Sequence, residues 1–346
     1  MKIKHGFRWL LACTWLVSAI GFVFAQDPGG KIVLRVADSF PVGHYIAEQT
    51  VKHWMNQVRQ ASGGMVDFEY YPAEQLGKAK DLLDLTLAGT VDIGYASPSY
   101  ISDRFPLSTV AELPGGFAAS CTGTLAYWKL ARDGVIAQKE MAPLGVRLLV
   151  TMAIPGYQLN TRSRFESLKD LEGMKIRTAG GAMDATMRRL KMVPIRIPGP
   201  EMYEAASRGT VDGVISPWAS VLAYKLDEHV KYTTVGENFS GYIANYIISE
   251  ARWKKLPERV RKLMWDAGEA STRNACGFAD RANEADRDRL KQRGMHFVQL
   301  SAADRKQIET QLATVANDWA ESLDKRGKPG TEVLKAFRAA LAQEGR

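Results

Sequence analysis

The sequence predicts an α/β protein of two lobes with mostly parallel sheets, a central cleft and a long bracing helix near the C-terminus. Strand and helix patterns alternate from residue 31 onward, which favours parallel strands joined by right-handed crossovers. A unit Gly-Thr-Val-Asp occurs twice, at residues 89–92 and 209–212, which indicates two lobes of similar build. A helical pattern of apolar residues then runs from residue 257 to 293, and a helix of about 50 Å could brace both lobes.

The first 25 residues differ in composition from the rest of the chain. Three cations precede an apolar run from Trp9 to Phe24, and small residues end this segment at Ala25. This pattern predicts a secretory signal peptide over residues 1–25. An uncleaved membrane anchor is the alternative, but the run is slightly short for a spanning helix and no other segment could cross a bilayer.

The composition is that of an ordinary globular protein, with 46% hydrophobic and 24% charged residues, so disorder is excluded. The formal charge of +8 falls by three to +5 when the cations of residues 1–25 are removed. This mild excess suits a small acidic ligand. The basic clusters lack interleaved aromatic residues, so we predict no nucleic-acid partner.

The N-terminal half predicts a lobe with three strands. Strands are expected at residues 31–37, 65–71 and 91–96, and helices at 45–61 and 78–87. Each copy of the repeated unit opens a strand that ends in a Ser-Pro turn, at Ser97-Pro98 and at Ser216-Pro217. Ligands bind at the carboxyl ends of strands in open α/β sheets, so both turns are candidates for the binding site.

The second lobe is expected to begin after a strand at 146–153. Its predicted strands lie at 174–178, 193–197, 211–216 and 295–300, and its helices at 183–191 and 201–207; residues 237–248 cross back, and terminal helices lie at 302–323 and 332–341. We therefore assign residues 26–154 to lobe I, with a return segment at about 243–282. Lobe II takes residues 155–242 and the C-terminal helices of 283–346.

Motifs for metal, nucleotide or nucleophilic chemistry are missing from the sequence. It holds no His-Glu-x-x-His, Cys-x-x-Cys, P-loop, Gly-x-Gly-x-x-Gly or Gly-x-Ser-x-Gly, and the histidines are scattered. We predict no metal, no cofactor and a binding protein rather than an enzyme. Cys121 and Cys276 could pair in an oxidising compartment, but their separation in sequence does not decide this.

Arg177 ends the predicted strand 174–178, between glycine-marked turns at Gly173 and at Gly180-Gly181. Its planar guanidinium matches the two oxygens of a carboxylate, and a helix that starts near Ala182 would add backbone N–H donors. The alternative is an arginine that lies at the surface or pairs with a nearby acid.

Several segments, in this order along the chain, resemble the extracytoplasmic solute-binding subunits of TRAP transporters, the DctP type. They are Tyr71–Gly77, Leu87–Ile93, Ala111–Pro114, Ser167–Arg177, Glu201–Ala205 and Gly209–Gly213. The resemblance covers essentially all of the mature chain. It implies a periplasmic protein of two lobes that closes on an organic acid and delivers it to the small and large TRAP membrane subunits.

In this family the arginine of the Lys-Ile-Arg segment, here Arg177, binds the ligand carboxylate. A second polar or basic contact comes from the segment just upstream, which here contains Asn160 and Arg162, with Arg164 close by. Which of the two arginines faces the cleft stays open.

One departure from the family pattern bears on the ligand. Many relatives carry an amide after the Val-Asp-Gly strand, where this chain has Ser216 and then Trp218, which could be a core residue or a wall of the site. Phe40 is expected at the end of the first strand, and Tyr95 and Tyr100 around the Ser97-Pro98 turn. We therefore predict a monocarboxylate with an apolar or aromatic tail.

The sequence also allows other ligands and other classes of protein. The ligand could be a C4-dicarboxylate or another hydroxy or keto acid. The protein could instead be an ABC-type or tripartite tricarboxylate receptor, a sensor subunit that presents its ligand to a membrane kinase, or an enzyme on a similar fold.

Overall fold

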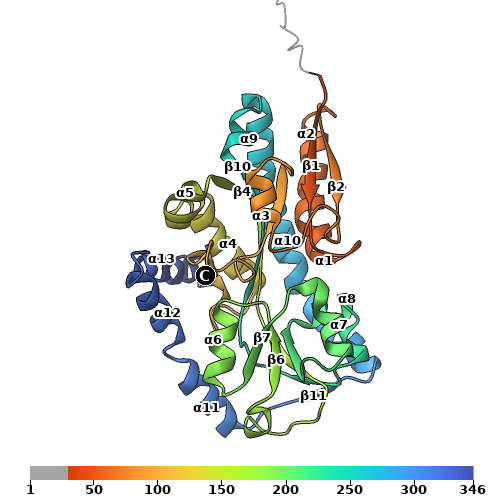
Figure 1. The fold of residues 1–346 in the computed structure, drawn as a ribbon, viewed down its shortest axis with the longest axis vertical. Helices are drawn as coiled ribbons and strands as arrows, with labels where there is room; N and C mark the ends of the chain where they lie inside the picture. Colours follow the sequence, from red (N-terminus) through yellow and green to blue (C-terminus); the bar gives the residue numbers. More distant parts are fainter. Residues whose placement is uncertain (1–29, 346) are drawn as a thin grey trace, which may run out of the picture. The chain divides into compact units, whose positions relative to one another are not determined.

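The computed structural model describes residues 30–345, so the predicted signal peptide at 1–25 lies outside the described residues. Two sheets organise this part of the chain, with strand orders β2-β1-β3-β10-β4 and β11-β9-β5-β8-β6-β7 (Figure 1). The first consists of β1 Ile32–Ala37, β2 Val66–Tyr71, β3 Ile93–Ala96, β4 Val146–Ile154 and β10 Tyr242–Ser249. The second consists of β5 Gln158–Thr161, β6 Lys175–Thr178, β7 Val193–Arg196, β8 Gly213–Ser216, β9 Tyr232–Thr234 and β11 His296–Val298.

The first sheet is parallel across β2, β1 and β3, whereas β10 runs antiparallel to both β3 and β4. Every residue of β10 is buried, as expected for a central strand with both faces covered. Its helices are α1 Tyr45–Ala47, α2 His53–Ala61, α3 Leu82–Leu87, α4 Ser120–Arg132, α5 Ala142–Leu144 and α9 Glu250–Lys254. The predicted helix at 45–61 is present, with a π-helical segment, η1 Glu48–Lys52, between α1 and α2.

The second sheet is parallel across β8, β6 and β7 and between β9 and β11, and β5 runs antiparallel to β8 and β9. The helices that follow its strands are α6 Ala182–Arg189, α7 Met202–Ser207 and α8 Trp218–Ala223. The remaining short segments are η2 Ser108–Glu112, η3 Ala137–Met141, η4 Lys169–Leu171, η5 Gly199–Glu201 and η6 Leu226–Glu228.

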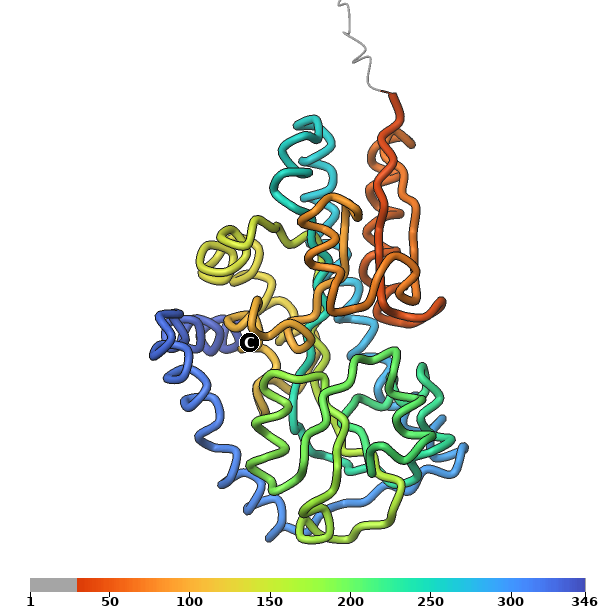
Figure 2. Tube along the Cα trace, in the orientation of Figure 1, coloured from red at the N-terminus to blue at the C-terminus, as the bar shows by residue number. Residues whose placement is uncertain are grey.

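The long helix α10, Glu258–Gln292, connects the two halves, as the continuous helical pattern predicted (Figure 2). It packs against α2, α4 and β4 of the first half and against α8 of the second. Gly268 makes its contact with β4 possible, because a Cβ there would lie 2.4 Å from the Leu149 carbonyl oxygen. The C-terminal helices are α11 Ala302–Leu312, α12 Val315–Asp324 and α13 Gly330–Glu344, and α13 packs against α4.

A disulfide between Cys121 and Cys276 joins the start of α4 to the middle of α10. One turn further along α10, the Asp280 carboxylate accepts hydrogen bonds from the backbone N–H groups of Ser120 (2.5 Å) and Cys121 (3.0 Å). The N-terminus of α4 is thus held by a covalent bond and by a carboxylate placed favourably for the helix dipole.

The predicted fold class, two α/β lobes with a bracing helix, is confirmed. The residue limits assigned to each lobe stay a prediction. Within residues 30–345, none of the helices has both the length and the apolar character that crossing a membrane requires.

Candidate functional site

Arg177 lies on β6 in the second half, in register with Ile195 of β7 and Val214 of β8. The side chain is only 3% exposed, and its Nε donates a 2.7 Å hydrogen bond to the Ile197 carbonyl. Within the described part of the chain it forms no ion pair with an aspartate or glutamate. A buried guanidinium without an acidic partner is energetically costly unless another anion compensates it.

Arg177 faces a small cavity at the carboxyl ends of strands from both sheets. The residues that line it are Phe40, Ile46, Tyr100, Tyr157, Arg177, Gly199, Met202, Ser216, Ser220, Tyr224 and Tyr242. Its volume is about 20 Å³, enough for a water molecule. This cavity lies where ligands bind in open α/β sheets, so we take it as the candidate site.

Five of the eleven residues that line the cavity are aromatic. Tyr157 and Tyr242 are stacked, with ring centroids 6.0 Å apart and planes inclined by 22°, and Tyr100 meets Tyr242 edge-on at 6.0 Å. Phe40 meets Tyr95 edge-on at 4.9 Å. Such a wall favours a flat apolar group over a flexible polar chain.

The hydroxyls of Tyr157, Tyr224 and Tyr242 in the cavity remain neutral at physiological pH. Burial raises the pKa values of Tyr157, Tyr224 and Tyr242 well above their ordinary value. The charge of Arg177 acts in the opposite direction on the pKa values of Tyr157 and Tyr224, so these two hydroxyls lie near the guanidinium. They can donate hydrogen bonds to an anion without competing with it for the arginine.

His44 supports the wall from behind and is not a charged group of the site. Its ring stacks on Phe40 at 4.4 Å, and its Nδ1 accepts a hydrogen bond from the Ile46 N–H. Burial lowers the pKa of His44 to about 3, so the imidazole is neutral. Arg177 is therefore the one cation that lines the described cavity.

The structure brings four of the sequence-predicted residues, Phe40, Tyr100, Arg177 and Ser216, into the cavity lining. Tyr95 lies directly behind the wall, where its hydroxyl shares a hydrogen bond with that of Tyr242. Ser97 is buried just after the end of β3 and does not line the cavity.

Asn160 and Trp218 lie in the interior of the second half rather than at the cavity. The Asn160 amide donates to the carbonyls of Gln158 (3.0 Å), Val214 (3.3 Å) and Ser216 (3.2 Å), which ties β5 to β8. Trp218 donates from Nε1 to the Thr233 hydroxyl at 3.0 Å. The Trp218 ring also packs edge-on against Phe297 at 5.2 Å.

Neither arginine of the upstream segment faces the cavity. Arg162 is exposed and donates a hydrogen bond to the Ala206 carbonyl. Arg164 is also exposed and forms a 2.6 Å ion pair with Glu166. A second cationic contact from this segment therefore stays a prediction without geometric support.

Tyr157, Tyr224 and Ser220 also line the cavity and were not predicted from the sequence. Tyr157 lies in the same upstream segment as Asn160, one residue before β5. Ser220 and Tyr224 are four residues apart at the cavity face of α8, a helix of six residues that was not predicted. Their spacing after the Ser216-Pro217 turn was the available signal.

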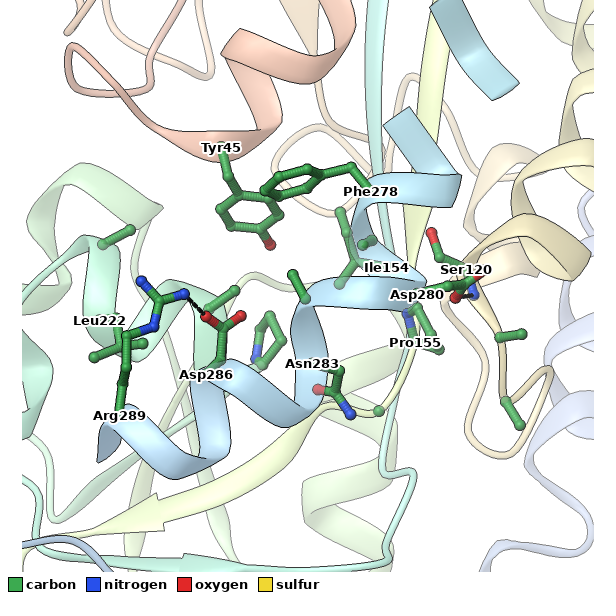
Figure 3. A pocket seen from close by; sticks show the side chains of 18 of the residues that line it. Tyr45, Ser120, Ile154, Pro155, Leu222, Phe278, Asp280, Asn283, Asp286 and Arg289 are labelled. Atoms are coloured by element: carbon green, nitrogen blue, oxygen red, sulfur yellow. Dashed lines mark hydrogen bonds and ion pairs between the residues drawn. The ribbon is translucent and has the colours of Figure 1, made fainter. Parts of the chain in front are cut away.

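A larger groove of about 700 Å³ lies on the other side of α8 and is lined by residues of α10, by Tyr45 and by Ile154 (Figure 3). Its cations are Arg289, which pairs with Asp286, and Arg293, which pairs with Asp227. No cation of this groove is left without an acid among the described residues. Of these two spaces, only the Arg177 cavity therefore holds a cation without an acidic partner among the described residues.

The chain has two α/β halves connected by crossing segments, and a buried cation lies in an aromatic cavity between the ends of their strands. This arrangement defines a two-lobed solute-binding protein. The comparison with protein families agrees, since residues 37–322 match the family Bacterial extracellular solute-binding protein, family 7, also called DctP. The chain belongs to this family of TRAP extracytoplasmic solute-binding proteins. The family is one of binding proteins and not of enzymes.

Individual relatives share the whole architecture at low sequence identity. The C4-dicarboxylate-binding periplasmic protein DctP of Rhodobacter capsulatus is 28% identical over 297 residues, which cover 82% of this chain and 83% of that protein. A TRAP solute-binding protein from Rhodoferax ferrireducens, solved with copurified benzoate, superposes with a TM-score of 0.83 at 24% identity and covers 91% and 99% of the two chains.

A second solved structure is similar to the same extent. The TRAP periplasmic solute-binding protein of Bordetella bronchiseptica, with bound (R)- and (S)-mandelate, has a TM-score of 0.81 at 25% identity over 90% of this chain and 99% of that one.

Proposed function

We propose that this protein is the periplasmic receptor of a TRAP-type secondary transporter and binds a monocarboxylate with an aromatic or apolar tail. The observation that carries the proposal is Arg177, which is buried at 3% exposure with no acidic partner among the described residues and faces a wall of tyrosine and phenylalanine rings. A ligand carboxylate would accept a bidentate pair from the guanidinium.

The charge of the cavity favours one carboxylate over two. Its lining holds one cation and no aspartate or glutamate. A monocarboxylate would neutralise Arg177, whereas the second carboxylate of a diacid would be desolvated without a partner. The aromatic wall would then pack against the remainder of the ligand.

The relatives support both the preferred ligand and its alternative. The solved proteins of Rhodoferax ferrireducens and Bordetella bronchiseptica hold benzoate and mandelate, which are aromatic monocarboxylates. The Rhodobacter capsulatus relative is named for C4-dicarboxylates, so a diacid ligand is the second candidate.

Closure of the two halves on the ligand is the proposed mechanism. The cavity takes Tyr100 from the first half and Gly199 from the second, and a 2.8 Å hydrogen bond joins them. A ligand that contacts both halves only when they are closed stabilises the closed form by its differential affinity. Export through the signal peptide at 1–25 and transfer to the small and large membrane subunits complete the proposed role.

Calorimetry with benzoate and succinate on the chain without residues 1–25 tests the proposal. We expect benzoate to bind and succinate not to bind. Arg177→Ala should weaken benzoate by about 2–5 kcal/mol, the cost of breaking a buried charge pair. Arg164→Ala, which removes an exposed arginine outside the cavity, is the matched control. Unchanged benzoate affinity in folded Arg177→Ala, or succinate binding in preference to benzoate, would refute the proposal.

A further inference from the structure

The Arg177 cavity and the 700 Å³ groove lie back to back, because the same short segments line both. On α8 and its C-terminal end, Ser220 and Tyr224 face the cavity, while Ala223 faces the groove. In the segment after β1, Phe40 faces the cavity and Tyr45 faces the groove. The partition between the two spaces is therefore formed by side chains of these two segments.

Tyr45 is the central side chain of this partition. Its ring stacks on His44 with centroids 4.8 Å apart, and His44 in turn lies 4.4 Å from Phe40 and 5.2 Å from Tyr224, both of which line the cavity. Figure 3 shows the Tyr45 ring beside Phe278 of α10.

The Tyr45 hydroxyl is buried and lies beside the Ser220 hydroxyl, which lines the cavity, but the two groups are not placed for a well-formed hydrogen bond. The present rotamer of Tyr45 is therefore only weakly stabilised by a polar contact. Movement of the ring would mainly give up packing, including the stacking on His44.

The small volume of the cavity limits the ligand that it can hold. The cavity measures about 20 Å³, whereas a cavity that binds benzene is on the order of 150 Å³. An aromatic acid held by Arg177 therefore needs additional space, and the nearest space is the groove behind Tyr45. The groove wall includes apolar side chains of Ile154, Leu222 and Phe278, which suit a hydrocarbon tail.

We infer that Tyr45 gates a passage between the two spaces, and that the ligand extends its tail past Tyr45 into the groove along α10. The substrate class would then be arylalkanoic acids, which carry the carboxylate at one end and an apolar ring several bonds away. This inference rests on the proposed function, because Arg177 holds the carboxylate. Tyr45 and the groove wall are the specificity-determining elements.

Calorimetry with two probes, benzoate and 4-phenylbutyrate, tests the inference on the chain without residues 1–25. Ala223→Phe and Ala282→Phe each place a ring in the groove from a different helix. We expect each to weaken 4-phenylbutyrate about tenfold or more, the effect of excluding a phenyl group from an apolar site, and to weaken benzoate by a clearly smaller factor, because its ring lies next to the carboxylate. The control is Ala285→Phe, an exposed position of α10 that does not line the groove.

Tyr45→Ala provides the opposite test, because it opens the partition without filling the groove. We expect it to strengthen 4-phenylbutyrate relative to benzoate. The inference is overturned if wild type binds benzoate but not 4-phenylbutyrate, or if both groove-filling variants bind the long acid as tightly as wild type does. If neither probe shows binding that depends on Arg177, the proposed function fails first. A crystal structure with 4-phenylbutyrate must place the phenyl ring in the groove.

Discussion

The hydroxyl of Tyr100 accepts a 2.8 Å hydrogen bond from the backbone N–H of Gly199. Tyr100 follows β3 of the first sheet and Gly199 follows β7 of the second, so this bond connects the two halves directly at the cavity. The same two residues line the candidate site. In the proposed mechanism, this pair of residues couples closure to ligand contact.

Tyr100→Phe should weaken benzoate binding by a factor of about 2 to 10. The variant retains the ring but loses a bond made in the closed form, and a single hydrogen bond contributes about 0.5–1.5 kcal/mol. Calorimetry measures the change. Tyr203→Phe is the control, because the Tyr203 hydroxyl bonds to Glu228 at the surface and away from the cavity.

Gly199→Ala tests the same contact by steric means. A Cβ at Gly199 would lie 2.9 Å from the Tyr100 hydroxyl and 3.0 Å from that of Tyr224. We expect a larger loss of affinity than for Tyr100→Phe, and small-angle scattering with benzoate should show a more open protein. Wild-type affinity in both variants would show that this contact plays no part in closure.

The disulfide between Cys121 and Cys276 should contribute about 2–5 kcal/mol to the free energy of unfolding. It closes a loop with a sequence separation of 155, so its loss leaves the unfolded chain far less constrained. Urea unfolding with and without a reductant measures the effect. The double variant Cys121→Ala/Cys276→Ala should be destabilised to the same extent and should not respond to the reductant; an equal response of both proteins would contradict this account.

The free energy of unfolding should decrease as the pH rises through the range in which Glu112 is protonated in the folded protein but ionised in the unfolded chain. Burial raises the pKa of Glu112 from 4.5 to about 8, although the Ser99 hydroxyl and the Ile243 N–H act against it. The folded protein keeps this proton while the unfolded chain releases it. The stabilisation is complete below about pH 4.5 and is lost as the pH rises to about 8.

Glu112→Gln should therefore reduce the pH dependence of the free energy of unfolding between pH 5 and 8, measured with urea at intervals of about one unit. Some dependence should remain, because burial also raises the pKa of Asp38 to about 6 and that of Glu140 to about 7. Glu309→Gln, at an exposed site, is the control. If the free energy of unfolding depends on pH with the same slope in wild type and in Glu112→Gln, the pKa of Glu112 is the same in the folded and unfolded states.

The strand that carries Arg177 could be predicted from the sequence because its limits are set locally. Glycines with positive φ stand on both sides, at Gly173 and Gly180, and the segment between them has the alternation of a strand. The long helix was predictable for the same reason, since apolar residues recur at helical spacing along it, although Ser271, Thr272 and Asp286 also lie on its buried face. Both features depend on neighbours in sequence.

The cavity wall depends on tertiary packing and was predicted only in part. Residues 218–224 lack a long periodic pattern, so the sequence did not show that Ser220 and Tyr224 would face one side and Trp218 the other. Asn160 lies in the same register row as Arg177, with Val214 between them, but neighbouring carbonyls occupy its amide. Strand register places these residues near the site, and side-chain packing determines which of them line the cavity.

Trp218 and Tyr224 are expected to affect different properties of the protein. Trp218 should affect stability, and Tyr224 should affect ligand binding. Trp218→Phe removes the hydrogen bond to Thr233 and part of the packing on Phe297, so it should lower the free energy of unfolding by about 1–3 kcal/mol. Benzoate affinity of the folded protein should stay within about twofold, because Trp218 does not line the cavity.

Tyr224→Leu should have the reverse effect. It removes a cavity hydroxyl close to Arg177 and an aromatic face, so benzoate should bind at least about tenfold more weakly. Urea unfolding and calorimetry on both variants separate the two roles. A strong loss of benzoate affinity in folded Trp218→Phe would instead support the sequence-based prediction that this tryptophan is a wall of the site, and the cavity would then have to extend to Trp218 when the ligand is bound.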